Sequence, residues 1–96
     1  MDQSQLSIVF ACLGQMTRLE ILKLLAPVSK GKNPKGLPAG EIATTLGVAP
    51  PTLSFHLKDM ALRNVLLQKR NGREIYYVAN LPFILGALEI LVIQLE

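Results

Sequence analysis

The sequence predicts a mainly α-helical domain with one β-hairpin, an α+β fold in which four helices precede the hairpin and a fifth follows it. Three patterns indicate this order. Apolar residues recur at helical spacing before residue 64, two strand-like runs then flank an Asn-Gly turn, and an apolar segment follows over residues 81–95. A length of 96 residues suits a single domain, 1–96, with a small core.

The first two helices are predicted from apolar spacing and from end signals. Residues 4–13 carry apolar side chains on one helical face, and Gly14 ends this helix. The apolar positions are Leu6, Val9, Phe10 and Leu13. Thr17 and Glu20 have the Thr-x-x-Glu spacing of a capping box. A second helix is therefore expected over residues 17–28.

Residues 29–37 form the next connection, because they combine two glycines and a proline with three lysines. The length of this loop indicates a mobile connection. A short amphipathic helix follows, with an apolar stripe at i, i+3, i+4 and i+7 and with Gly47 as a left-handed stop. Its stripe consists of Ala39, Ile42, Ala43 and Leu46.

The fourth helix is expected over residues 50–63. Pro50 and Pro51 can open it, since a proline in the first turn loses no intrahelical hydrogen bond. One face is apolar and predicted to pack on the core: Leu53, Leu57, Met60 and Ala61. The other is predicted to face outward: Thr52, Ser54, Phe55, Lys58 and Asp59. Together the third and fourth helices have the outline of a helix-turn-helix.

A β-hairpin follows Asn64, a residue that tolerates the left-handed conformation at a helix end. Residues 65–70 and 74–79 are rich in branched and aromatic side chains, and Asn71-Gly72 predicts a two-residue type I′ turn between them. The last helix is expected to begin at residues 80–82, with Pro82 in its first turn.

The charge is unevenly distributed although the net charge is only +3. Between residues 58 and 73 one acid, Asp59, accompanies Lys58, Arg63, Lys69, Arg70 and Arg73, whereas residues 81–96 carry only Glu89 and Glu96. This polarity indicates a basic face for a polyanion and an apolar end for self-association.

The fourth helix and the hairpin together predict a DNA-binding surface, as a recognition helix for the major groove and a basic wing for phosphates. The candidate contacts are Pro51, Thr52, Ser54, Phe55, His56, Lys58, Lys69, Arg70, Asn71 and Arg73. Thr52 and Ser54 can donate or accept hydrogen bonds, and Phe55 can meet a thymine methyl. The alternative is an ordinary solvated helix beside a hairpin whose charges protect its edge.

Half of the residues are hydrophobic, more than one small domain needs to bury. We expect the excess to form a two-fold homodimer interface from the first and last helices. Its candidate residues are Leu6, Val9, Phe10, Phe83, Ile84, Leu88, Leu91, Val92 and Leu95. Membrane association is disfavoured, because the last segment is shorter than the ~20 residues of a membrane span and has no basic polar face.

Catalysis and metal binding have little support in the sequence. Cys12 is the only cysteine and His56 the only histidine, so we expect no disulfide, catalytic site, metal site or cofactor. Cys12 is read as a small core residue and His56 as a hydrogen-bonding residue at the edge of the helix. With no secretory signal, a cytoplasmic location is expected.

Three motifs in this order resemble the ArsR family of bacterial winged-helix repressors. Leu13-Gly14 with Thr17-Arg18-Leu19-Glu20-Ile21-Leu22 is similar to its early segment, Pro51 to Leu57 to its recognition helix, and Gly72-Arg73-x-x-Tyr76-Tyr77 to its wing. The chain departs at Gln15-Met16, Ala49 and Asn64, which stand where the family usually has Asp-Pro, a capping Ser and Gly. Leu37-Pro38-Ala39-Gly40 and the apolar residues 81–95 replace the metal ligands of sensing members, so no metal site carries over.

The resemblance implies a winged helix-turn-helix regulator that binds a pseudo-palindromic operator in double-stranded DNA as a homodimer and acts as a repressor. The inducer is not readable from the sequence. The alternative is a protein-interaction module that uses the same scaffold without reading DNA, since a fold does not fix a function.

Overall fold

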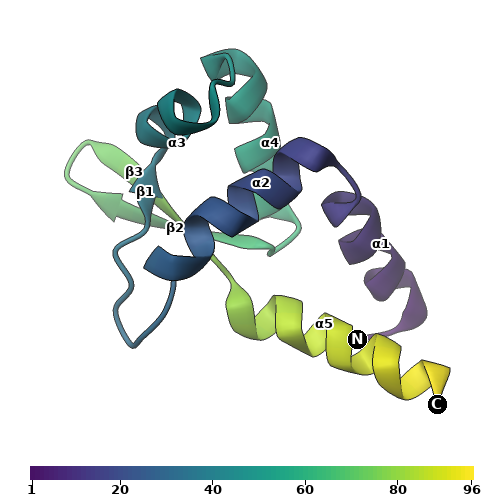
Figure 1. Ribbon diagram of the computed structural model, residues 1–96. Coiled ribbons are helices and arrows are strands. Elements are labelled where there is room, and N and C mark those ends of the chain that lie inside the picture. The colour runs from purple at the N-terminus through teal and green to yellow at the C-terminus, as the bar shows by residue number, and fades with distance from the viewer.

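The computed structural model describes the whole chain, residues 1–96. The helices and strands occur in the predicted order, and a short additional strand joins the hairpin (Figure 1). The elements are α1 (Gln3–Leu13), α2 (Met16–Leu25), η1 (Ala26–Val28), β1 (Leu37–Pro38), α3 (Ala39–Leu46), α4 (Pro50–Leu62), β2 (Leu66–Asn71), β3 (Glu74–Ala79) and α5 (Leu81–Leu95).

The predicted capping box at Thr17 and Glu20 is wrong. Helix α2 already begins at Met16, and the backbone N–H of Leu19 donates to the carbonyl of Gln15, so Thr17 lies inside the first turn. A capping box exists instead at α1, where the backbone N–H of Gln5 donates to Asp2 Oδ1 over 2.8 Å and the Asp2 N–H donates to Gln5 Oε1 over 2.9 Å. Helix α2 ends at Leu25 and not at the predicted residue 28, and residues 26–28 continue as a 3₁₀ turn that contains Pro27.

The sheet has the order β1-β3-β2 and is antiparallel throughout. The turn of the hairpin lies one residue later than predicted, because Asn71 pairs with Glu74 and leaves Gly72 and Arg73 as the two turn residues. Gly72 has φ 66° and Arg73 has no positive φ, the combination of a type II′ turn and not of type I′. A type I′ turn at Asn71-Gly72 would need positive φ at both residues.

The helix-turn-helix is formed by α3 and α4 as predicted. Gly47 ends α3 with φ 67°, and the backbone N–H of Val48 donates to the carbonyl of Ala43 over 3.1 Å. After α4, Asn64 has φ 69°, as expected for the residue that ends this helix. Neither α2 nor α4 has a side-chain cap at its start, where the sequence has Gln15 and Ala49.

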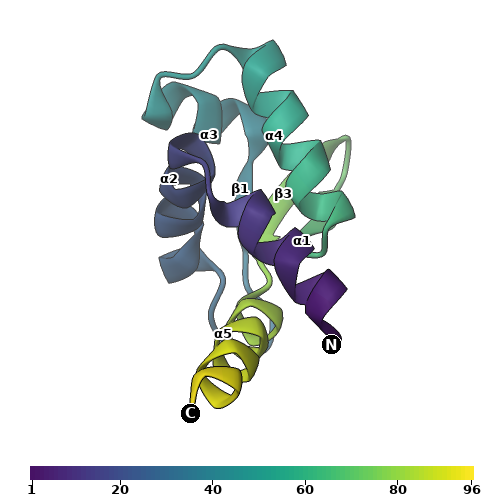
Figure 2. The same ribbon diagram turned by 90° about the vertical axis from the view of Figure 1, so that its right-hand side faces the viewer.

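Two clusters of buried side chains hold these elements together. The larger cluster joins α2, α3, α4 and the sheet, with Ile21, Leu25, Ile42, Leu57 and Met60 fully buried. The smaller one consists of Leu6 and Val9 of α1 and Ala87 of α5. Figures 1 and 2 both show α5 at the opposite end of the molecule from α3. No helix has the length and apolarity required to cross a membrane.

Candidate nucleic-acid interface

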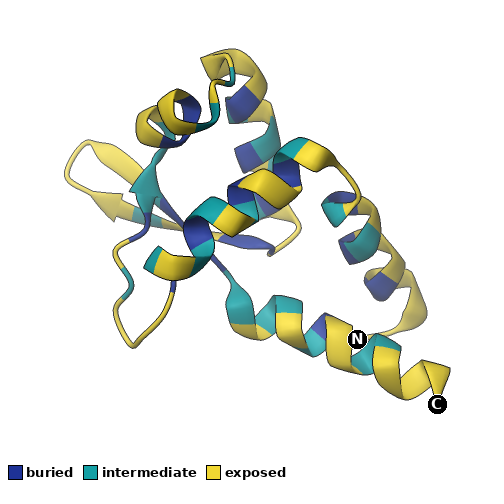
Figure 3. Cartoon of the chain, viewed as in Figure 1, coloured by how far each residue is buried: buried dark blue, intermediate teal, exposed yellow.

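Helix α4 divides into a buried and an exposed face, as the sequence predicts (Figure 3). Leu53, Leu57 and Met60 are at most 1% exposed, because their spacing keeps them on the core side. The other side carries candidate DNA contacts. Pro51, Thr52, Phe55 and Lys58 are exposed, and Ser54 and His56 are half-buried. Phe55 is 66% exposed, an unusual degree of exposure for an aromatic side chain.

The wing, which is the β2–β3 hairpin with its Gly72-Arg73 turn, separates its cations between two faces. Side chains alternate along a strand, so Lys69 shares a face with its partner Tyr76, and Arg70 lies on the other face with Ile75. Arg73 occupies the turn at the tip of the wing. The predicted cationic residues therefore do not form one row.

Lys69 is engaged within the protein. Its Nζ donates to Asn33 Oδ1 over 2.9 Å and to the carbonyl of Pro34 over 2.5 Å. Both acceptors belong to the loop between η1 and β1, so Lys69 joins this loop to the wing. Arg70, Asn71 and Arg73 remain exposed.

The loop is also fastened at its two ends. The backbone N–H of Gly36 donates to the carbonyl of Val28 over 3.1 Å, and the Ser29 hydroxyl accepts from the N–H of Ala79 over 2.8 Å. A Cβ at Gly36 would collide with the carbonyl of Tyr77 and with Val78 Cγ1. The glycine is therefore required for the loop to lie directly on β3.

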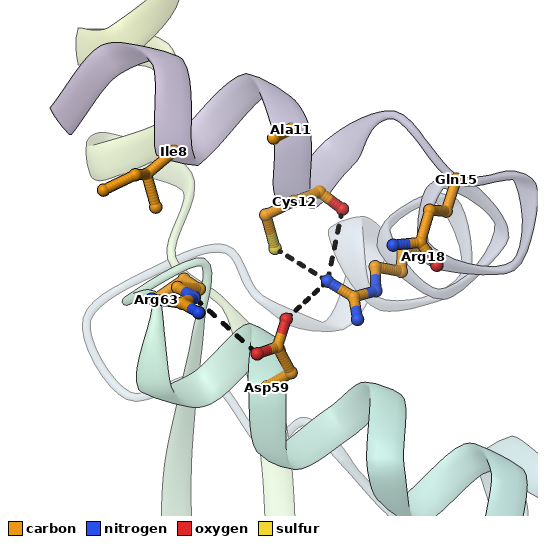
Figure 4. Close-up of a pocket in the computed structure, with 7 residues that line it drawn as sticks. All are labelled: Ile8, Ala11, Cys12, Gln15, Arg18, Asp59 and Arg63. Atoms are coloured by element: carbon orange, nitrogen blue, oxygen red, sulfur yellow. Dashed lines mark hydrogen bonds and ion pairs between the residues drawn. The ribbon is translucent and has the colours of Figure 1, made fainter. Parts of the chain in front are cut away.

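A buried arginine connects α1, α2 and α4, which the sequence interpretation missed. The Arg18 side chain is 4% exposed, and Figure 4 shows it between Cys12 and Asp59. Its Nη1 donates to Asp59 Oδ2 over 2.6 Å and to Cys12 Sγ over 3.3 Å, while its Nε donates to His56 Nδ1 over 3.0 Å. The signal was present, because Arg18 lies three residues before Ile21 and seven before Leu25, on the buried stripe of α2.

Asp59 was predicted to face outward, but its carboxylate instead binds Arg18 and completes this network. Besides its contact with Arg18, Asp59 Oδ1 lies 3.6 Å from Arg63 Nε on the next turn of α4. Asp59 can bind Arg18 because its position on α4 faces α2 at this point. The carboxylate therefore neutralises the buried guanidinium of Arg18.

His56 is held as a neutral imidazole. Its burial lowers the pKa of the ring, the Arg18 guanidinium lowers it further, and Asp59 acts in the opposite direction. The geometry requires the same state, since Nδ1 accepts a hydrogen bond from Arg18 and cannot carry a proton.

Residues beside this network line a cavity of about 270 Å³ (Figure 4). The lining residues are Ile8, Ala11, Cys12, Gln15, Arg18, Asp59 and Arg63. Cys12 is buried and unpaired with any other cysteine, as a core residue would be. No three histidine, cysteine, aspartate or glutamate side chains are arranged so that they could hold a metal ion.

The predicted interface residues of α1 and α5 differ in their accessibility. Leu6 and Val9 are 4% and 3% exposed because they pack against Ala87 of the same chain. Phe10, Phe83, Ile84 and Leu91 are half-buried. The exposed apolar side chains of α5 include the predicted Leu88, Val92 and Leu95, and also Leu85 and Ile93, which the predicted set did not contain.

Comparison with known proteins agrees with this geometry. Residues 13–66 match a family described as a helix-turn-helix domain. The chain is 35% identical over 72 residues to the transcriptional repressor SdpR of Bacillus subtilis (strain 168), covering 75% of this chain and 72% of that protein.

Two solved structures extend the similarity to the wing and the outer helices. An ArsR-like transcriptional regulator from Rhodococcus sp. RHA1 has a TM-score of 0.78 and 28% identity, over 92% of this chain and 76% of that one. A homodimeric winged helix-turn-helix DNA-binding domain from Mycobacterium bovis, a possible ArsR-family transcriptional regulator, has a TM-score of 0.72 and 25% identity, over 96% of this chain and 77% of that one.

Proposed function

The chain belongs to the ArsR family of winged helix-turn-helix transcriptional regulators, and we propose that it represses transcription by binding an operator in double-stranded DNA as a homodimer. One observation carries this proposal. The face of α4 opposite its buried leucines presents short polar side chains, an aromatic ring and a cation to solvent. Such a face suits the donors, acceptors and methyl groups of the major groove. A bacterial regulator of this kind would act in the cytoplasm.

Within α4 we assign base contacts to the first two turns. Pro51, Thr52 and Ser54 lie near the start of the helix, the part that approaches base edges in helix-turn-helix proteins. Phe55 would meet a thymine methyl, and Lys58 a phosphate.

The wing would add phosphate contacts through Arg70, Asn71 and Arg73, which are exposed. Lys69 was predicted to contact DNA, and in this proposal it mainly supports the loop between η1 and β1. Two of its three N–H donors serve the loop, so it would keep one for a phosphate.

Dimerisation supports operator recognition, because two half-sites one helical turn apart need two recognition helices in fixed positions. The exposed leucine and branched side chains of α5 offer an apolar surface for a second copy. The M. bovis domain of similar fold is homodimeric, which supports the same assembly here.

A binding selection tests the proposal. Wild-type protein is used to select duplexes from a random-sequence library, and the affinities for the selected duplex and a scrambled duplex are compared by gel shift. We expect Thr52→Ala and Ser54→Ala to reduce the preference for the selected duplex, each by about tenfold. Arg73→Gln should weaken both duplexes alike, and Lys23→Gln, an exposed lysine of α2, is the charge-matched control.

A wild-type protein that enriches no sequence would refute operator binding. An operator preference unchanged in both Thr52→Ala and Ser54→Ala would refute the assignment of α4 as the recognition helix.

A further inference from the structure

We propose that the buried Arg18 fixes His56 in the tautomer with its proton on Nε2, and that His56 thereby offers a neutral donor from α4 to an acceptor on DNA. The inference rests on the proposed function, and it assigns Arg18 as a positioning residue of the DNA-binding surface. The hydrogen bond from Arg18 Nε to His56 Nδ1 is its starting point.

The direction of this hydrogen bond is unambiguous. A guanidinium has only N–H donors and stays protonated in proteins, so Arg18 cannot accept. His56 Nδ1, 3.0 Å from Arg18 Nε, must therefore present its lone pair. A neutral imidazole carries one proton, which leaves it on Nε2. A doubly protonated ring would bring two N–H groups against each other.

The Arg18 side chain is held firmly enough to fix the tautomer of His56. Its Nη1 is held by Asp59 Oδ2 at 2.6 Å, and by the carbonyl and Sγ of Cys12 at 3.5 and 3.3 Å. These partners lie on α4 and α1, on two sides of the guanidinium. The side chain is 4% exposed, so water does not compete for its N–H groups.

The opposite nitrogen of His56 is open to solvent. No hydrogen bond within the chain involves His56 Nε2, and no buried side-chain nitrogen or oxygen lacks a partner. Nε2 must then be accessible. His56 lies four residues after Thr52, on the same side of α4, and its ring meets the exposed Phe55 edge-on with centroids 5.7 Å apart. The donor therefore stands among the residues that we assign to base contacts.

Burial and a neighbouring cation keep this donor neutral near pH 7. The burial of the ring lowers the pKa of His56 most, Arg18 of α2 lowers it further, and Asp59 of α4 acts in the opposite direction. Cys12 of α1 contacts Arg18 and has no hydrogen bond to the ring, and Arg63 of the next turn pairs with Asp59. A neutral donor suits a base acceptor or a phosphate oxygen, and the two can be separated experimentally.

The tautomer can be measured directly, because His56 is the only histidine of the chain. Two-bond ¹H–¹⁵N correlation spectra of the uniformly labelled protein distinguish protonated from unprotonated ring nitrogens. At pH 7 we expect one protonated nitrogen, Nε2. In Arg18→Met we expect a mixture of both neutral tautomers and a higher midpoint of the His56 titration. A proton on Nδ1 in the wild type, or an Arg18→Met spectrum identical to the wild type, would overturn the tautomer assignment.

A pair of His56 variants tests the use of the donor while Arg18 itself is unchanged and keeps its contacts with Asp59 and Cys12. His56→Asn keeps an acceptor near the position of Nδ1 but loses the outer donor, whereas His56→Gln extends an amide N–H toward the position of Nε2. Against the duplex selected by the wild type, we expect about a tenfold loss of affinity for His56→Asn and a clear partial recovery for His56→Gln. Thermal unfolding of both variants checks that the fold is kept.

The scrambled duplex separates the two acceptors. A loss confined to the selected duplex identifies a base edge, and an equal loss on both duplexes identifies a phosphate. Wild-type affinity of His56→Asn for both duplexes would overturn the DNA half of the inference while operator binding stands. A wild type without any sequence preference would overturn the proposed function and this DNA half together, and the spectra would still decide the tautomer.

Discussion

At the scale of single residues, Arg18 is the side chain with the most consequences. It lies on the apolar stripe of α2, and removing its charge from water is costly. The cost is offset by the ion pair with Asp59 and by hydrogen bonds to Cys12 and His56. Such a network requires one relative position of α1, α2 and α4, whereas apolar contacts alone would tolerate several.

Loss of the guanidinium should therefore destabilise the fold. We expect Arg18→Met to lower the free energy of unfolding by about 3 kcal/mol, because Asp59 loses its main partner and keeps only Arg63. Urea denaturation at pH 7 measures this change. Arg63→Met is the control, and its more exposed ion pair should cost at most about 1 kcal/mol. Equal losses in the two variants would contradict a special role for Arg18.

Protonation of His56 should also destabilise the protein. Because its pKa is lowered in the folded state, the unfolded chain takes up this proton first as the pH falls. The stabilisation is complete above the unfolded pKa of about 6.5 and is lost as the pH drops below it toward the folded pKa. We expect the free energy of unfolding to fall between pH 7 and pH 5, as followed by urea denaturation. His56→Gln, which cannot titrate, should flatten this dependence.

At the scale of elements, the connections decide how the DNA-binding surface is presented. The sequence interpretation treated residues 29–37 as a mobile loop, but this loop donates a hydrogen bond to Val28 and accepts hydrogen bonds from Ala79 and Lys69, which fasten it to the sheet. Residues 37–38 even add the short strand β1. The wing is thus supported on one face by a loop and on the other by the core.

Two glycine substitutions in this loop test the attachment. Gly36 and Gly31 both have positive φ, of 71° and 91°, so Gly→Ala strains the backbone at either position by about 1 to 2 kcal/mol. Only at Gly36 would the Cβ meet β3, whereas nothing lies within 4 Å at Gly31. We expect Gly36→Ala to cost at least about 1 kcal/mol more than Gly31→Ala in urea denaturation, since overpacking adds to the strain. Equal costs would mean that the loop does not press on the sheet.

At the scale of the whole molecule, the two ends have different surfaces. Residues 58–73, from the recognition helix to the tip of the wing, carry five of the ten lysines and arginines. Helix α5 has no lysine or arginine and exposes apolar side chains. The extents of 44 × 29 × 19 Å describe an elongated shape, in which α5 lies away from α3 (Figure 1). DNA binding and self-association can therefore occur on separate surfaces.

Disruption of the α5 surface should separate the two activities. Val92 is 56% exposed on α5, and a glutamate there would lose the free energy of apolar burial in a dimer without entering the core. We expect Val92→Glu to sediment as a monomer and to lose at least about tenfold in operator affinity. Leu67→Glu, at a 44% exposed leucine of β2, is the control and should leave the sedimentation unchanged. A Val92→Glu protein that is still a dimer would place the interface elsewhere.

The order of the predicted elements, the buried face of α4 and the left-handed ends at Gly47 and Asn64 could all be predicted from the sequence. These features are local, because helical spacing and glycine or asparagine conformations depend on nearby residues only. The hairpin was also predictable, although Asn71 paired with Glu74 and moved the turn by one residue. Several near-equivalent registers exist for a short turn, and pairing along the whole ladder selects one.

The contacts between side chains that are distant in the sequence could not be predicted in this way. The contacts of Arg18 with His56 and Asp59 join residues 38 and 41 positions apart, and that of Lys69 with Asn33 spans 36. Burial of Leu6 and Val9 under Ala87 likewise required the docking of α5 on α1. No spacing rule reaches so far along a chain, because such contacts depend on how helices and sheet pack. Helix packing therefore places Arg18, an arginine of the early motif, where its side chain binds His56 and Asp59 of the recognition helix.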